Sequence, residues 1–187
     1  MHTPGHAVIN LAILSGAVTP EHTLPIVAGA ILPDVPIVVL YLREHYLRGL
    51  PEERIWSESY QRPFWLNLIH GAHSIPLTLL GTLVGVATGS SLVAIFFGSM
   101  LLHALGDLPV HAVDAHRHFL PFSHYRFISP ISYWDPRYHG RKVALVEALL
   151  VAGATAWLWR DSSLTARLLL SAVLAWYAFS YWKAFLR

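Results

Sequence analysis

The chain has 187 residues, of which 55% are hydrophobic and only 13% are charged. A soluble domain of this size could not bury so much apolar surface, because its ratio of surface to volume is too high; the composition is typical of a membrane protein. The absence of cysteine excludes disulfides and thiolate metal ligands, and a net charge of +2 gives no reason to expect nucleic acid as a partner.

Six apolar segments follow one another, at residues 5–18, 24–42, 66–88, 92–110, 143–159 and 164–186. A helix needs about 20 apolar residues to cross the hydrocarbon core of a bilayer, and the last four segments reach or approach that length. The first segment is short, and Pro33 and Pro36 interrupt the second, so this pair either spans or forms a broken, partly re-entrant hairpin.

The sequence therefore predicts an all-α fold, a polytopic membrane bundle of about six helices whose partner is the lipid bilayer. We expect a single membrane-embedded domain over residues 1–187, with a metal-site region at 1–142 and a C-terminal helical hairpin at 143–187.

Basic residues are unevenly distributed over the connections. Six crossings would place both termini and the two long connections, residues 43–65 and 111–142, on one side of the membrane. That side would hold eleven of the thirteen lysines and arginines, and the other side only Arg160 and Arg167. Because cytoplasmic loops are enriched in lysine and arginine, we expect both termini to be cytoplasmic.

Six ionisable side chains fall inside the apolar segments and lie, at about 1.5 Å per residue, within roughly 12 Å of the same face: His6, Asp34, His70, His73, His103 and Asp107. Such groups are costly inside a bilayer and normally mark a function. His103 and Asp107 are four residues apart and share a helix face. Imidazole and carboxylate donors without cysteine favour a divalent metal such as zinc, manganese or iron.

The connection after the fourth segment adds four more donors at the rim of the same layer: His111, Asp114, His116 and His118. This density could complete a two-metal site, in which two ions hold the attacking and leaving oxygens of a displacement reaction.

Several short motifs resemble those of a known family. They are TPGH ending at His6, AILPD ending at Asp34, the pair His73–Ser74, HALGD from His103 to Asp107, PFS at 121–123, and SPISYWDPRYHG at 129–140. In this order the first five resemble the YdjM-like family of inner-membrane metal-dependent hydrolases, and the stretch at 129–140 looks like that of a bacterial subgroup of uncharacterised membrane proteins. The resemblance covers roughly residues 1–140.

That family is in turn similar to the zinc-dependent phospholipase C and single-strand nuclease superfamily, whose substrates are phosphoesters. The resemblance implies a bacterial inner-membrane protein whose metal ligands are His6, Asp34, His73, His103 and Asp107. The chain departs from the family pattern in two places. The residues before the third ligand, His73, differ from the usual motif, since the chain reads HGAHS at 70–74, and there is no clear His-x-x-x-Glu pair.

The leading hypothesis is a cytoplasm-facing, membrane-embedded hydrolase that acts on a phosphoester, either a lipid or a nucleotide-like small molecule. One or two divalent ions, zinc first among them, would activate a water molecule as nucleophile. Asp114 would serve as general base or further ligand and His111 and His118 as ligand or acid, while Arg117 and Arg126 would bind the phosphate.

Three alternatives remain. The same cluster could belong to a transporter or ion-handling protein, or the histidines could ligate haem. In a purely structural interpretation, Asp34 caps a broken helix and His116 and His118 are solvated loop residues.

Overall fold

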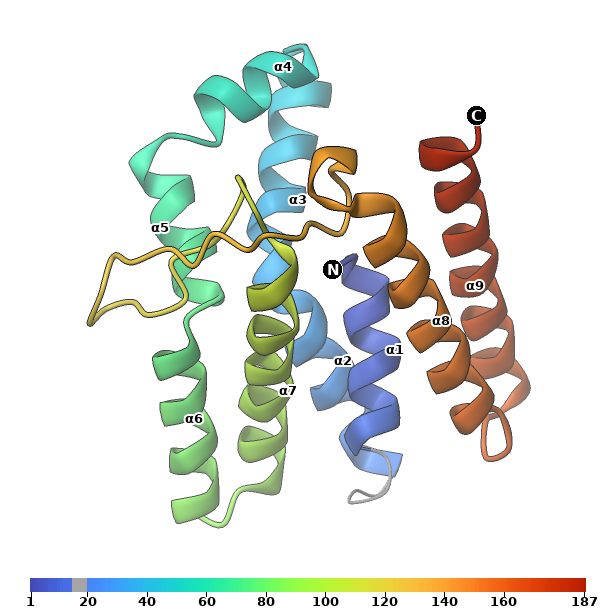
Figure 1. The fold of residues 1–187 in the computed structure, drawn as a ribbon. Coiled ribbons are helices and arrows are strands. Elements are labelled where there is room, and N and C mark those ends of the chain that lie inside the picture. Colours follow the sequence, from blue (N-terminus) through green and yellow to red (C-terminus); the bar gives the residue numbers. More distant parts are fainter. Residues whose placement is uncertain (15–19) are drawn as a thin grey trace.

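The computed structural model describes residues 1–14 and 20–187, and every regular element in this part of the chain is helical. The α-helices are α1 (Thr3–Leu14), α2 (Thr23–Ile31), α3 (Val35–Leu42), α4 (Glu52–Arg54), α5 (Pro63–Ala72), α6 (Ile75–Ala87), α7 (Ser91–Asp107), α8 (Gly140–Trp159) and α9 (Leu164–Phe185) (Figure 1). Short 3-10 or π-helical turns are η2 (Pro20–His22), η3 (Leu32–Asp34), η4 (Arg43–Leu47), η5 (Ile55–Ser59), η6 (Leu108–Val110) and η7 (Pro136–Tyr138). The predicted all-α bundle is confirmed; the expected end of the first segment, at residue 18, lies outside the described residues.

Among the described residues, four helical stretches are long and apolar enough to cross a membrane: Thr23–Leu47, Ser91–Val110, Gly140–Trp159 and Leu164–Phe185. Helices α5 and α6 would add a fifth if the two together count as one span. They are bent by 46° where they meet, so the pair forms either a broken span or a re-entrant loop. Helix α1, at 12 residues, is a shorter apolar helix.

The main break lies in the third apolar segment, whereas we expected it in the second. Pro33 produces only the 3-10 turn η3, and helical backbone continues on both sides of it. At the α5–α6 junction, Ser74 adopts an extended conformation and its hydroxyl accepts a hydrogen bond from Leu77 N at 3.2 Å. This N-cap, followed by Pro76 in the first turn, starts a new helix in a new direction. His73 therefore lies at the bend.

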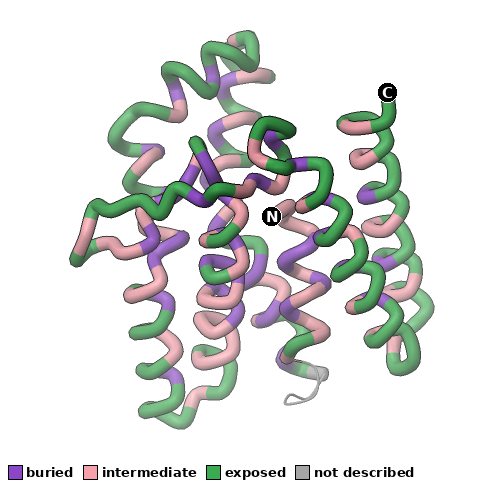
Figure 2. The backbone as a smooth tube through the Cα atoms, in the orientation of Figure 1, coloured by how far each residue is buried: buried purple, intermediate pink, exposed green. Residues whose placement is uncertain are grey.

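The outward faces of the bundle are apolar. Large side chains more than half exposed on α8 and α9 include Leu149, Leu150, Trp157, Leu168 and Leu169. Buried residues gather instead where α1, α7 and the segment after α7 meet (Figure 2). Because apolar patches of this extent are unfavourable in water, these faces fit contact with lipid acyl chains.

The long connections and the C-terminus lie at one end of the bundle, and the α6–α7 and α8–α9 connections lie at the other (Figure 1). Arg160 and Arg167 are at the second end, where Arg167 Nε donates to the carbonyl of Trp159 at 3.2 Å. The other eleven lysines and arginines lie in the long connections, at the start of α8 or near the end of α9. They therefore group at the end of the bundle with the long connections, as we expected.

Helix α7 packs closely against α2 and α6 through glycines. A Cβ atom on Gly29 would lie 2.2 Å from the carbonyl oxygen of Phe96, and one on Gly85 would lie 2.3 Å from Ala94 N. Small residues of this kind allow close backbone approach between membrane helices. The position of α7, which carries His103 and Asp107, is thereby fixed from two sides.

We expect Gly29→Ala to destabilise the fold by about 1–3 kcal/mol, because the added methyl group meets rigid backbone rather than a movable side chain. Thermal unfolding in detergent, followed by intrinsic tryptophan fluorescence, measures the effect. Gly153→Ala on α8 is the matched control, since a Cβ there meets nothing within 4 Å. Equal melting temperatures for the two variants would contradict the close approach.

Candidate metal centre

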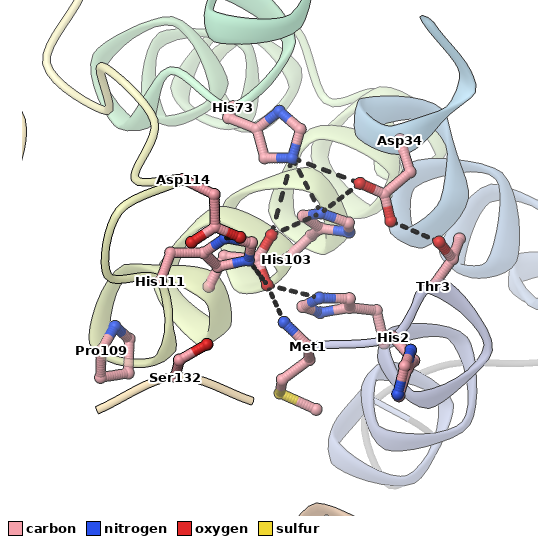
Figure 3. Close-up of polar contacts among 12 residues, drawn as sticks. Met1, His2, Thr3, Asp34, His73, His103, Pro109, His111, Asp114 and Ser132 are labelled. Atoms are coloured by element: carbon pink, nitrogen blue, oxygen red, sulfur yellow. Dashed lines mark hydrogen bonds and ion pairs between the residues drawn. The ribbon is translucent and has the colours of Figure 1, made fainter. Parts of the chain in front are cut away.

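Asp34, His73 and His103, from three separate parts of the sequence, point toward one another inside the bundle (Figure 3), and Asp107 joins them in one group of ionisable side chains. Asp34 ends η3, His73 lies at the α5–α6 bend, and His103 and Asp107 occupy one face of α7. One donor atom from each lies within 4.8 Å of the other three. Of the five ligands that the resemblance implied, the structure brings these four into one compact group.

The separations of the four donor atoms match a tetrahedron. Tetrahedral ligands at 2.0–2.2 Å from an ion are about 3.3–3.6 Å from one another. His73 Nε2 lies 3.2 Å from His103 Nε2, 3.5 Å from Asp34 Oδ1 and 3.6 Å from Asp107 Oδ2. His103 Nε2 lies 3.7 Å from Asp34 Oδ1 and 3.2 Å from Asp107 Oδ2. These five of the six edges, at 3.2–3.7 Å, lie within about 0.1 Å of the range expected around a tetrahedral divalent ion.

Backbone carbonyl groups fix the orientation of both imidazoles. Nδ1 of His73 is 2.8 Å from the carbonyl oxygen of Ile69, and Nδ1 of His103 is 2.7 Å from that of Ala30. Because a carbonyl oxygen can only accept, each contact places a proton on Nδ1, and Nε2 is the nitrogen directed toward the centre. Metal-bound histidines in proteins are usually held in this way.

Asp34 is oriented by Thr3 of α1, whose hydroxyl donates to Asp34 Oδ2 at 2.5 Å. The other oxygen, Oδ1, faces the two imidazoles. The carboxylate makes no capping hydrogen bond to the start of α3, although Asp34 occupies the N-cap position. The structural alternative, in which Asp34 only caps a broken helix, is therefore wrong.

Asp107 is 1% exposed, and it also contacts residues outside the group of four. Its Oδ1 is 2.9 Å from His6 Nε2 and 3.4 Å from His111 Nε2, and it also forms an ion pair with the amino group of Met1. The ring of His6 stacks on that of His103, with centroids 3.7 Å apart. His6 thus contacts the group through Asp107 and is not one of its four donors.

The segment after α7 is folded over the cluster. Ile75 N donates to the carbonyl of His118 at 2.8 Å and Ser74 Oγ donates to that of Leu120 at 2.5 Å, so the segment is tied to the α5–α6 bend. His116 and His118 are 3% and 1% exposed. The alternative that these two are solvated loop residues is wrong.

Histidines of this segment differ in protonation. Burial opposes protonation of His111, but the carboxylates of Asp107 and Asp114 outweigh it and raise its pKa to about 9. Burial, together with His73 and His111, lowers the pKa of His116 well below its ordinary value. Burial also lowers the pKa of His118 to about 4. His116 is consequently neutral and able to act as a ligand, whereas His111 would have to release a proton to bind a metal.

A cavity of about 730 Å³ lies next to the cluster. Its lining includes Asp34 and His70, His111, Asp114 and His116, and both candidate phosphate-binding residues, Arg117 and Arg126. Arg126 also bonds to backbone carbonyls, through Nε to Ala115 at 2.7 Å and through Nη2 to Val113 at 3.1 Å. Arg117 is therefore the freer of the two guanidinium groups to meet a ligand.

Of the other predicted catalytic residues, His111 and Asp114 line the cavity, and His118 does not. His111 Nδ1 is 3.0 Å from Asp114 Oδ2, and this pair lines the cavity. The ring of His118 is 5.7 Å from that of His116 and 6.5 Å from that of His73. His118 joins neither of the two groups of donors that could hold a metal in the described part of the chain.

Two contributors were not identified from the sequence: Thr3 orients Asp34, and Trp134 Nε1 donates to Asp114 Oδ2 at 2.9 Å. His116, one of the four donors expected in the connection after α7, joins Asp107 and His111 in a second group of donors. No pattern in the sequence indicated Thr3 or Trp134.

Comparison with protein-family models, with curated proteins and with solved structures finds no match to this chain.

Thr3→Val should weaken divalent-metal binding by about 10- to 100-fold, because the loss of a hydrogen bond to a ligand typically has an effect of this size. Competition with a chromophoric chelator measures the dissociation constant. Thr3→Ser keeps the hydroxyl and should restore nearly wild-type affinity. An unchanged affinity in Thr3→Val would show that Thr3 does not orient Asp34.

Proposed function

We propose that this protein is a membrane-embedded, metal-dependent hydrolase of phosphoesters, belonging to the YdjM-like family. The observation that carries the proposal is the tetrahedral arrangement of Asp34, His73, His103 and Asp107 beside a cavity with two arginines. His73, His103 and Asp107 are buried and Asp34 is partly buried. Four ionisable side chains with these separations are expensive in an apolar bundle unless a cation binds between them.

The donor set fits zinc. Two imidazole nitrogens and two carboxylate oxygens, with the spacing described above, are ligands that zinc commonly takes, while manganese and iron accept the same atoms. A divalent ion held there supplies Lewis-acid activation of water.

Residues around the cavity have the chemistry that hydrolysis of a phosphoester requires. Arg117 would bind the phosphate through charge-assisted hydrogen bonds, with Arg126 shaping the same wall. Asp114 uses Oδ2 to hold His111 and Trp134, and its Oδ1 would accept the proton of the attacking water. As the water oxygen bonds to phosphorus, the ester P–O bond would break and the leaving oxygen would take up a proton.

Part of the cavity wall is apolar and includes Ile37, Val38, Leu66 and Val113, with Trp56 beside them. A phosphoester with an apolar or ring-containing part, either a lipid or a nucleotide-like compound, would therefore fit better than a small polar phosphate.

The bias of basic residues supports an orientation in the bacterial inner membrane. Eleven of the thirteen lysines and arginines belong to the end with the long connections, and this end would face the cytoplasm. The cavity, which is lined by residues of these connections, would then open toward the cytoplasm.

Buried polar side chains farther from the cluster favour a one-ended pocket over the transporter alternative. Asn10 Nδ2 donates to the carbonyl and hydroxyl oxygens of Ser99 at 2.8 and 2.9 Å, and Ser99 Oγ donates to the carbonyl of Ile26 at 2.6 Å. These groups hydrogen-bond one another and are not free to coordinate a moving solute. Flux measured in proteoliposomes distinguishes the two functions.

Purified wild-type protein should contain a divalent metal that Asp107→Asn and His103→Ala lose, together with any hydrolysis of bis-p-nitrophenyl phosphate. Elemental analysis of detergent-solubilised protein measures the first effect and absorbance of nitrophenolate the second. Asp161→Asn, at the opposite end of the bundle, is the control and should change neither. If His103→Ala and Asp107→Asn kept both metal and activity, the proposal would be wrong.

Arg117→Ala should raise the KM for a phosphodiester about 10- to 100-fold while leaving the metal content unchanged, because a hydrogen bond from a charged donor contributes about 1.5–3 kcal/mol. Steady-state kinetics with matched elemental analysis test this. Arg141→Ala, an exposed change at the start of α8, serves as the control. Unchanged KM would remove Arg117 from the phosphate site.

A further inference from the structure

The carboxylate of Asp107 divides its two oxygens between two groups of imidazoles. Oδ2 faces His73 and His103, at 3.6 and 3.2 Å, whereas Oδ1 is 3.4 Å from Nε2 of His111. Asp107, His111 and His116 form a second group of donors, one atom from each lying within 4.8 Å of the others, and all three residues are buried. The two groups share Asp107 alone.

Two nitrogens of the second group lack hydrogen bonds. Nε2 of His111 and Nδ1 of His116 are buried and make no hydrogen bond in the described ranges 1–14 and 20–187, although Nε2 of His111 has the ion-pair contact with Asp107. The two side chains are 6% and 3% exposed. A buried polar atom without a partner costs about 1–3 kcal/mol, and a cation between these rings would remove that cost.

His111 is held in the orientation that a ligand needs. Its Nδ1 lies 3.0 Å from Asp114 Oδ2, and the same oxygen accepts a hydrogen bond from Trp134 Nε1 at 2.9 Å. A carboxylate bonded to one ring nitrogen directs the other nitrogen toward a metal. Here that other nitrogen, Nε2, faces Asp107.

The two groups differ in how they could meet a substrate. The first supplies four protein ligands, so an ion there could take water only as a fifth ligand, and its imidazoles from His73 and His103 are 0% exposed. The second supplies three, which is the number typical of catalytic sites that keep a position open. His111 and His116 both line the cavity, so the open position would face it.

We propose that a second divalent cation binds between Asp107, His111 and His116, that the Asp107 carboxylate bridges it to the first, and that this second ion is the one open to the substrate phosphate. The inference rests on the proposed function, and it states which of the two metal ions faces the substrate. It gives His116 a role as a ligand, and Asp114 the role of positioning His111.

The test is the metal stoichiometry of four proteins, each stripped with a chelator, reloaded with zinc and freed of excess ion. Wild type should retain two ions per chain, and His116→Ala should retain one and lose phosphodiester hydrolysis. Asp107→Asn should lose both ions, because it removes the bridge. His124→Ala is the control: it changes an exposed histidine of the same segment and should retain two.

Cobalt titration of the wild type, followed by visible absorbance, provides a second measurement that depends on no variant. Two successive equivalents should each add absorbance, and one retained ion in His116→Ala would also show that this variant is folded. A wild type that saturates with one ion, or a His116→Ala protein that retains two, would overturn the second site while leaving the proposed function intact. A wild type that binds no divalent ion would overturn both.

Discussion

The structure depends on one buried negative charge, the carboxylate of Asp107, placed inside an apolar helical bundle. A carboxylate removed from water is strongly unfavourable unless positive charge or hydrogen-bond donors surround it. Here imidazoles approach it from α1, from the α5–α6 bend, from α7 itself and from the segment after α7. The need to compensate this group explains why segments that are distant in the sequence converge at a single point.

The helices meet this requirement through local backbone features. Close contacts at Gly29 and Gly85 hold α7 in place, so that Asp107 has a fixed position. The Ser74 cap turns the chain between α5 and α6 and puts His73 opposite α7. Hydrogen bonds from the same bend then anchor the segment that carries His116. One turn in the backbone thus positions ligands for both groups of donors.

The distribution of polarity connects the membrane and the chemistry. Outward faces carry leucine and tryptophan, and the interior carries the histidines and carboxylates, which is the reverse of a soluble domain. A low-dielectric interior strengthens the attraction between a cation and its carboxylates. It also disfavours any state in which the donors remain without a cation or a proton, which is consistent with a group that could hold a metal ion.

The sequence by itself determined the all-α membrane architecture, because apolar segments of this length admit few other structures. It also determined the pairing of His103 with Asp107, since helical periodicity puts residues four apart on one face. Only the tertiary structure decided which donors meet. The bend fell at Ser74 and not at Pro33, because a capped start of a new helix changes direction more than a 3-10 turn does. In the irregular segment after α7 no periodicity relates His111, Asp114, His116 and His118, so the choice of His116 as a partner of Asp107 depended on how that segment packs against the bend.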